Sequence, residues 1–200
     1  MIGVMESGAR PRRPRAAGSL AIGYVGLAGF LVLEATTRRR GDASRLDATG
    51  DDADTTRRLG RAYAIGAAAP LLAVIPAPRL GRGAAVVGLA TQAAGLGLRA
   101  WSMRALGRAY TRTLRAVEDQ RVVEEGPYRF VRHPGYLGSL LIWLGFGLTS
   151  RNPLVVAAIA GVSGDAYRRR IAAEDRLLRR ELPGYGRYAE RTSRLVPFIW

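Results

Sequence analysis

Two polar clusters of the chain carry the residue types that could do chemistry. The first runs from Glu124 to Tyr136, reads E-E-G-P-Y-R-F-V-R-H-P-G-Y and contains the only histidine, His133. Gly126-Pro127 and His133-Pro134 restrain its two ends, because each proline fixes its own φ and disfavours helix at the preceding residue. This segment is therefore predicted to be a shaped polar loop or a broken helix.

The second cluster lies between Arg168 and Glu181. It places Arg170 and Glu174 four residues apart, so in a helix the two side chains share one face. Taken alone, this pattern is typical of an exposed helix with weak surface ion pairs. An apolar hairpin separates the two clusters, however, and both ends of a hairpin lie on the same side. We therefore expect the two clusters to be neighbours in space.

Each of these side chains allows more than one role. His133 could be a general base or could hydrogen-bond to the backbone. Tyr128 and Tyr136 offer flat faces for a purine, or could anchor the chain at a membrane interface. Glu174 could accept hydrogen bonds from ribose hydroxyls or an ammonium group, and Arg170 could bind a carboxylate or a phosphate. Together they suit a ligand that is both a nucleoside and a zwitterion.

The elements that must position these clusters are predicted from apolar blocks alternating with arginine-rich blocks, a pattern of small polytopic membrane proteins. No strand-like alternation is present, so the predicted fold is an all-α integral membrane protein with about five transmembrane helices. The expected spans are residues 16–36, 59–78, 83–103, 136–150 and 154–166. The last two are shorter than the ~20 residues of a full crossing and form the hairpin, with a turn at Arg151-Asn152-Pro153. A buried hairpin of a soluble protein is the alternative.

Several features outside the clusters carry structural expectations. Gly23, Gly26 and Gly29 could let another helix approach the first span closely. Gln92, in the third span, is interpreted as a helix–helix hydrogen-bond partner in preference to a ligand contact. Residues 41–58, with five aspartates including Asp52, are expected to form a solvated loop. A basic helix at 167–182 and an amphipathic piece at 185–200 complete the chain.

Composition narrows the function classes. The absence of cysteine excludes a disulfide framework and a thiolate nucleophile, and a single histidine makes a zinc or iron site improbable. The net charge is +15, and all the positively charged side chains are arginines, because the chain has no lysine. It could indicate nucleic acid, but no recognised binding motif is present, so cationic loops flanking membrane spans are favoured. No G-x-G-x-x-G follows a strand, so a Rossmann cofactor site is not supported.

The motifs of the C-terminal half are specific as a combination. They are G-P-Y-R-F-V-R-H-P-G-Y-L-G at 126–138, an apolar hairpin with Asn152-Pro153, R-I-A-A-E-D-R-L-L at 170–178, G-Y-G-R-Y at 184–188 and R-L-V-P at 194–197. Over residues 98–197 the chain thereby resembles the isoprenylcysteine carboxyl methyltransferase family, and the related phospholipid N-methyltransferases share much of this pattern. One departure is that the family's Glu-Glu pair reads Glu174-Asp175.

The resemblance implies a membrane enzyme that uses S-adenosylmethionine, bound on the cytosolic face without a Rossmann domain. It implies that Arg170 positions the carboxylate of the methyl acceptor. No metal is expected, because the chain has one histidine and no cysteine. Carried over by motif, the residues that line the cofactor site are Gln120, Arg121, Val122, Val123, Tyr128, His133, Pro134, Gly135, Tyr136 and Glu174.

The implied reaction is in-line methyl transfer from a sulfonium to a lipophilic acceptor that enters from the bilayer. A carboxylate acceptor needs no base, whereas an amine or phenol would make His133 or Asp175 candidate bases. A phospholipid or a long-chain phenol remains an alternative acceptor. A non-catalytic membrane scaffold and a charge-driven binder of membrane surface or nucleic acid are the alternatives from other classes.

The domain organisation follows from these assignments. Residues 1–15 are expected to be a disordered basic N-terminus, 16–103 the N-terminal spans, and 104–200 the methyltransferase core. Most arginines lie in the loop before the second span, in 104–133 and at the C-terminus, so this face is predicted to be cytoplasmic. With five spans the basic N-terminus would then lie outside, in conflict with the same rule.

Overall fold

The computed structural model describes residues 16–38, 52, 54–107 and 121–196, and in this part of the chain every regular element is a helix, joined by turns and irregular segments and accompanied by one isolated bridge between Val131 and Ser193. The prediction of an all-helical fold is therefore confirmed there. The expected disordered residues 1–15 lie outside the described part. The elements are α1 (Ala16–Arg38), α2 (Thr55–Ala68), the 3-10 helix η2 (Ala69–Val74), α3 (Arg82–Leu106), the 3-10 helix η4 (Gly126–Arg129), α4 (Pro134–Thr149), α5 (Pro153–Glu181) and α6 (Tyr185–Arg191).

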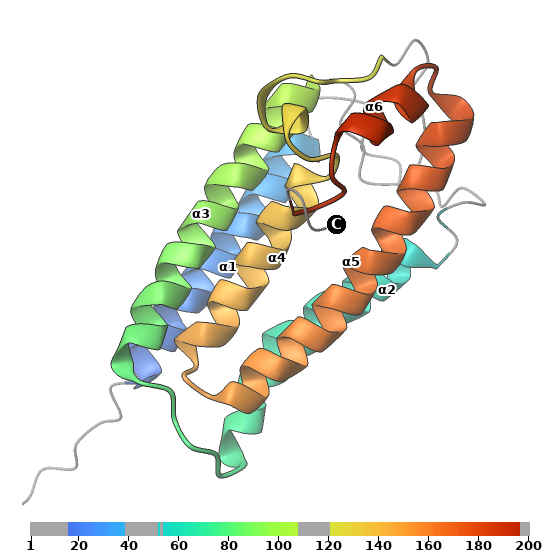
Figure 1. Cartoon of the computed structure of the whole chain (residues 1–200). Helices are drawn as coiled ribbons and strands as arrows, with labels where there is room; N and C mark the ends of the chain where they lie inside the picture. Colours follow the sequence, from blue (N-terminus) through green and yellow to red (C-terminus); the bar gives the residue numbers. More distant parts are fainter. Residues whose placement is uncertain (1–15, 39–51, 53, 108–120, 197–200) are drawn as a thin grey trace, which may run out of the picture.

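The long helices form a bundle that is capped at one end. Figure 1 shows α1, α3 and α4 side by side, with α5 lying along α2 next to them, and the contacts between elements agree. The short helix α6 folds back from the end of α5 and lies near the beginning of α4. The polar motifs of the C-terminal half are thus gathered at this capped end.

The tightest packing joins α3 and α4 through glycines. A Cβ atom added at Gly95 would lie 2.6 Å from the carbonyl oxygen of Gly138, and one added at Gly145 would lie 2.5 Å from the carbonyl oxygen of Gly88. In each helix the two glycines are seven residues apart, so both pairs lie on the facing surfaces. Backbone therefore packs directly on backbone, as in membrane helix pairs with small residues at the interface.

Helix α1 packs on the same pair in the way the sequence predicts. A Cβ atom at Gly23 would lie 2.5 Å from Thr149 Oγ1, so this glycine does permit a close approach. Gln92 Nε2 donates a hydrogen bond of 3.0 Å to the carbonyl oxygen of Gly23, and the Gln92 side chain faces Gly26. The interpretation of Gln92 as a helix–helix partner is therefore confirmed. Gly29 has only an ordinary contact with Leu96.

The predicted hairpin joins α4 and α5 at its expected turn. Asn152 caps α5, because its Oδ1 accepts a hydrogen bond of 2.9 Å from the backbone N–H of Leu154. Arg151 adopts a positive φ of 56° and donates two hydrogen bonds to the carbonyl oxygen of Leu80, of 3.0 and 2.8 Å. One correction concerns the arm that follows. The apolar segment 154–166 and the basic helix 167–182 are one continuous helix of 29 residues.

The prediction of a solvated loop over residues 41–58 is wrong where the structure describes it. Helix α2 begins at Thr55, four residues before the predicted span, and the Asp52 side chain is buried with 1% exposure. The physical reason is a buried guanidinium that pairs with Asp52, described below. Asp54, by contrast, is half exposed and forms an ion pair with Arg58 at 2.6 Å.

The outer surface of the bundle is apolar over several helices. Within the described residues, α1 alone is both long and apolar enough to cross a membrane, over Gly18–Thr36 with a mean hydropathy of 1.6. Helix α4 is apolar but has only 16 residues. Large apolar side chains are nevertheless exposed on α1, η2 and α3, with Val25 at 69%, Leu71 at 74% and Val86 at 69%. Exposed apolar surface of this kind is typical of a membrane or protein contact.

The glycine contact between α3 and α4 gives a matched test on one helix. Gly95→Ala should lower the free energy of unfolding by about 1–3 kcal/mol, because the new methyl group must push the α4 backbone away. Gly97→Ala has nothing within 4 Å of the added Cβ atom and should be neutral or stabilising by up to about 1 kcal/mol. Thermal unfolding of the two variants in the same detergent measures the difference. Equal melting temperatures would contradict the backbone contact.

Candidate active site

The two polar clusters meet at one buried carboxylate, that of Asp175 in α5. Its Oδ1 accepts a hydrogen bond of 2.6 Å from the hydroxyl of Tyr185 and lies 3.0 Å from His133 Nε2. Its Oδ2 accepts a hydrogen bond of 2.9 Å from Arg194 Nε, and Arg132 Nε lies 3.6 Å from Oδ1. These partners come from the loop before α4, from α6 and from the C-terminal segment. The predicted neighbourhood of the two clusters is therefore confirmed.

The charge state of Asp175 follows from these contacts. Burial opposes ionisation, but hydrogen bonds from His133 and Tyr185, with electrostatic interactions with His133 and Arg132, outweigh it and hold the pKa of Asp175 well below its ordinary value. An ionised carboxylate only accepts, so His133 Nε2 carries the proton in this contact. Asp175 thus serves as the common acceptor that assembles the capped end. Its oxygens are already used in this way, which disfavours it as a general base.

The backbone reinforces the same junction. The N–H of Arg132 donates to the carbonyl oxygen of Ser193 at 2.8 Å, and the N–H of His133 donates to that of Arg194 at 3.0 Å. Arg132 Nη1 also donates to the carbonyl oxygens of Ala189, at 2.7 Å, and Thr192. The C-terminal segment is therefore fixed to the loop that carries His133.

Glu174, the neighbour of Asp175, is in a different situation. Its Oε2 is buried and has no hydrogen-bond partner among the described residues, although His133 Nδ1 lies 3.7 Å away and the Tyr136 hydroxyl interacts with the same carboxylate. The side chain as a whole is 27% exposed, so it can be reached from outside. A buried carboxylate oxygen without a partner is costly, and such a group calls for a functional or structural explanation.

The aromatic residues of the first cluster are engaged with the protein. The ring of Tyr136 stacks on His133 with centroids 5.7 Å apart, so one face of this ring is already covered. Tyr128 is buried in η4, and its carbonyl oxygen accepts a hydrogen bond of 2.6 Å from the hydroxyl of Tyr188. Burial raises the pKa of the Tyr188 hydroxyl to about 12, so it stays protonated as the donor. Only the uncovered parts of the Tyr128 and Tyr136 rings therefore remain for the expected contact with a purine.

Pro134 and Gly135 form the first turn of α4. Pro134 is fully buried at the N-terminus of the helix, where its missing N–H costs nothing. The carbonyl oxygen of Gly135 accepts a hydrogen bond of 2.8 Å from Arg99 Nη1, and Arg99 Nε donates to Glu34 Oε1 at 2.6 Å. Both charged side chains are buried, and the sequence interpretation did not predict this pair. This ion pair ties α1 and α3 to the loop of His133.

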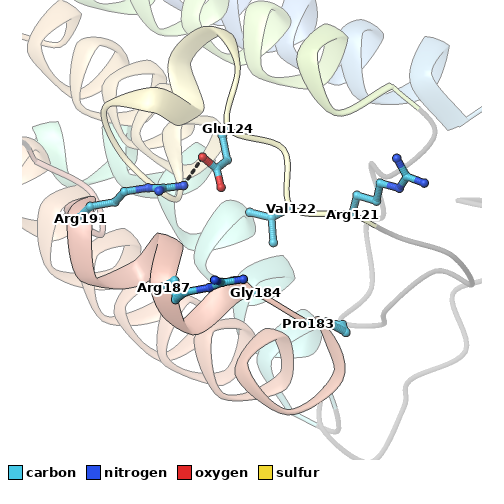
Figure 2. Close-up of a pocket in the computed structure, with 7 residues that line it drawn as sticks. All are labelled: Arg121, Val122, Glu124, Pro183, Gly184, Arg187 and Arg191. Carbon is cyan, nitrogen blue, oxygen red and sulfur yellow. Dashed lines mark hydrogen bonds and ion pairs between the residues drawn. The ribbon is translucent and has the colours of Figure 1, made fainter.

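The remaining predicted cofactor residues lie beside the two clusters. Arg121 and Val122 are in an extended segment, and Val122 packs against the core under α6. Neither Val122 nor Val123 makes a backbone hydrogen bond within the described part of the chain. Gln120 lies outside the described residues. A cavity of about 500 Å³ opens between this segment and α6 (Figure 2), lined by Arg121, Val122, Glu124, Pro183, Gly184, Arg187 and Arg191. Its lining includes neither His133 nor Glu174, so it does not contain their contact.

Arg170 does not lie on an exposed helix face, so that alternative is wrong for this residue. It is 2% exposed, and its Nη1 donates to Asp52 Oδ1 and, at 2.8 Å each, to the hydroxyls of Thr55 and Thr56. Its Nε donates to the hydroxyl of Tyr136 at 3.2 Å. Asp52, Thr55 and Thr56 were missed by the sequence interpretation. The available signal was an acid followed by two threonines at the start of a helix.

No group of three or more histidine or acidic residues within the described ranges is arranged to hold a metal ion. Glu174 offers an acceptor, Arg170 offers directed donors, and Asp175 holds the elements that carry them.

The Asp175 contacts predict a specific loss. Asp175→Asn should destabilise the capped end by about 3–5 kcal/mol, because it leaves the buried charge of Arg132 without its carboxylate. Limited proteolysis in detergent should then cut within residues 184–195 faster than in the wild type. Glu190→Gln, an exposed acidic position in the same region, is the control. Equal cleavage rates in both variants would show that Asp175 does not hold the C-terminal segment.

Because the folded-state pKa of Asp175 lies below the ordinary value, acidification should weaken the attachment of the C-terminal segment only below about pH 4.

Comparisons with known proteins match the same half of the chain. Residues 87–180 match the model of the isoprenylcysteine carboxyl methyltransferase family. A probable protein-S-isoprenylcysteine O-methyltransferase of Oryza sativa subsp. indica is 34% identical over 116 residues, which cover 56% of this chain and 61% of that protein. The cobalt-zinc-cadmium resistance protein CzcN of Cupriavidus metallidurans is 32% identical over 103 residues, covering 51% of this chain and 48% of its own length.

A solved structure shares the fold. The eukaryotic intramembrane Ras methyltransferase, an isoprenylcysteine carboxyl methyltransferase, superposes with a TM-score of 0.57 at 23% identity, over 68% of this chain and 52% of that one. The chain thus spans about half to three fifths of the length of these proteins. The family model covers the loop of His133, the hairpin and the helix of Arg170 and Glu174. The resemblance to the isoprenylcysteine carboxyl methyltransferase family that the motifs predict is therefore confirmed over residues 87–180.

Proposed function

We propose that this chain is an integral membrane methyltransferase that transfers a methyl group from S-adenosylmethionine to a lipophilic carboxylate. The observation that carries the proposal is the buried, unpartnered Oε2 of Glu174, 3.7 Å from His133, where the two motif clusters touch. The family match over residues 87–180 supports the reaction class. The names of the matched rice protein and of the superposed structure support an isoprenylcysteine carboxyl group as the acceptor.

The residues present fit such a methyl donor. Glu174 Oε2 would accept a hydrogen bond from a ribose hydroxyl or from the ammonium group, which satisfies the orphaned oxygen. The extended segment at Val122 and Val123 would offer backbone groups that the described part of the chain leaves without partners. His133 and Tyr136 would supply an aromatic wall. When bound, S-adenosylmethionine supplies a methyl group activated by a sulfonium.

The side chains of the site suit an acceptor that needs no base. A carboxylate is already a nucleophile at neutral pH, so the protein has only to bind it, align it and exclude water, effects that can supply about 7–11 kcal/mol. His133 and Asp175 are engaged with each other, in agreement with a reaction that does not call on either as a base. Arg170 would orient the carboxylate through its directed N–H groups.

We place the protein in the membrane with several spans. The exposed apolar side chains on α1, η2 and α3 would face lipid, and the glycine contact of α3 with α4 is of the kind that membrane helices use. The capped end carries the arginines of residues 121–132 and 168–194. By the distribution of positive charge, this end would face the cytoplasm. The acceptor would then reach the site from the bilayer.

Glu174 gives the direct test of the cofactor site. Glu174→Gln keeps the shape but removes the charge, so the dissociation constant for S-adenosylmethionine should rise at least about tenfold, or ~1.4 kcal/mol. Glu181→Gln, on the same helix and 43% exposed in an ion pair with Arg180, should bind as the wild type does. Calorimetry in detergent compares the three proteins. If the wild-type protein shows no saturable binding of S-adenosylmethionine, the methyltransferase proposal is wrong and a non-catalytic scaffold is favoured.

Arg170 tests the nature of the acceptor. Arg170→Lys should retain cofactor affinity within about threefold but lose most turnover on a small prenylated cysteine with a free carboxyl group, because an ammonium lacks the planar donor fork. Arg169→Lys, an exposed neighbour paired with Asp165 at 2.8 Å, is the control. Methyl transfer from labelled cofactor gives the rates. If Arg170→Lys instead weakens cofactor binding at unchanged turnover of the bound complex, Arg170 belongs to the cofactor subsite.

The acceptor itself is identified by incubating membranes that contain the protein with labelled S-adenosylmethionine. Label in a base-labile methyl ester indicates a carboxylate acceptor. Label in a base-stable N-methyl group or aryl methyl ether would instead identify the acceptor as an amine or a phenol.

A further inference from the structure

The start of α2 contains an arrangement that the family motifs do not include. Asp52 lies 118 residues before Arg170 in the sequence, yet its carboxylate is buried against that guanidinium. Thr55 and Thr56 donate to its two oxygens, at 2.6 Å to Oδ1 and 2.7 Å to Oδ2. We propose that Asp52, Thr55 and Thr56 form a clamp that positions Arg170 for the methyl acceptor. This inference rests on the proposed function.

The hydrogen bonds of the clamp form a closed set. Each threonine hydroxyl gives its single proton to Asp52 and accepts from Arg170 Nη1 at 2.8 Å. Both oxygens of Asp52 are therefore fixed by hydroxyl groups of the same helix turn, and three acceptors share the two hydrogens of Nη1. A network in which all members are satisfied holds its geometry more firmly than an isolated ion pair.

The guanidinium is held from a second direction as well. Nε donates to the hydroxyl of Tyr136 at 3.2 Å, and the Tyr136 ring stacks on His133. Thus Nη1 of Arg170 is bound by residues at the start of α2, and Nε is bound by Tyr136 of α4. The backbone of Arg170 belongs to α5. Directional hydrogen bonds on two of its nitrogens restrain the orientation of the guanidinium, so the clamp and Tyr136 together orient this group relative to the loop of His133.

The charge balance defines what the clamp does. Asp52 neutralises Arg170, and both groups are nearly inaccessible to solvent, at 1% and 2% exposure. An isolated buried cation would be costly, so the acid allows Arg170 to stay in the interior at all. Because the pair carries no net charge, Arg170 would act on an incoming carboxylate through the orientation of its guanidinium. Asp52 is therefore a positioning residue: it acts on the acceptor through Arg170.

The competing interpretation is that Asp52 occupies the place of the acceptor carboxylate and must leave before the acceptor binds. The two threonine hydroxyls argue against it. If Asp52 left, both hydroxyls would lose their hydrogen-bond acceptor, and the Asp52 carboxylate would need new donors elsewhere. The two interpretations predict opposite effects of weakening Asp52. Removal of a clamp lowers the rate, whereas removal of a competitor improves acceptor binding.

The test compares Asp52→Asn with Asp54→Asn, which removes a half-exposed acid two residues away. The readouts are cofactor affinity, kcat and KM for the small prenylated cysteine, and melting temperature, all with the full chain in detergent. Asp52→Asn should keep cofactor affinity within about threefold and lower kcat about ten- to hundredfold, the scale of a misplaced catalytic group. Asp54→Asn should keep the wild-type rate. Equal rates in the two variants, or a lower KM with unchanged kcat in Asp52→Asn, overturn the clamp.

A milder variant covers the case in which Asp52→Asn fails to fold. Thr56→Val removes one hydroxyl at nearly constant volume and leaves both charges in place. It should lower kcat at least about threefold, and Thr56→Ser, which returns the hydroxyl, should recover most of the loss. No loss in Thr56→Val, or the same loss in Thr56→Ser, overturns the role of the hydroxyl network.

A double-mutant cycle with Arg170→Lys separates this inference from the proposed function. If Asp52 acts through Arg170, the two changes have much less than additive effects on kcat and on melting temperature. Additive losses overturn the clamp. The melting temperatures need no substrate, so they test the coupling of Asp52 to Arg170 even if the wild-type protein transfers no methyl group, an outcome that would refute the proposed function alone.

Discussion

The structure around the candidate site depends on one constraint: a charge taken out of water must find its partner within the protein. Asp175 meets it with an imidazole, a phenol and two guanidinium groups, and through them joins four separate segments. The capped end of the bundle has a small apolar core of its own under α6, formed chiefly by Leu182, Tyr185 and Tyr188. Shared polar contacts thus decide where that core sits relative to the helices.

The same constraint connects the two halves of the chain. Arg99 joins Glu34 of α1 to the Gly135 carbonyl, and Arg170 of α5 pairs with Asp52, which directly precedes α2. Both arginines place an N-terminal acid next to the loop of His133 or its neighbour Tyr136. The N-terminal helices, which carry no recognisable motif, therefore contribute buried charges on which the geometry of the motif-bearing half depends.

How much the sequence could predict follows from the range of each interaction. The hairpin was predictable because Asn152-Pro153 is a local signal, and the meeting of His133 with the helix of Glu174 followed from that hairpin alone. The pairs Glu34–Arg99 and Asp52–Arg170 join residues 65 and 118 positions apart, and no local pattern specifies such partners. Polar composition suggested water around Asp52, where the fold supplies a buried guanidinium. The continuity of α5 was missed for a related reason, since a change from apolar to basic residues resembles an element boundary although the backbone continues.

That continuity has a mechanical consequence. Helix α5 runs unbroken from the hairpin turn at Asn152 to Glu181, and about 25 Å of rigid helix separate its first residue from Arg170. A continuous helix of this length moves as a rigid rod, so a tilt at one end displaces the other end. Any tilt imposed at the turn by a thicker or thinner bilayer would move Arg170, Glu174 and Asp175 as one body, in the same direction and without altering their mutual spacing. In the proposed membrane enzyme, the thickness of the surrounding lipid would then act on the position of these three residues relative to the loop of His133 and to the bound reactants.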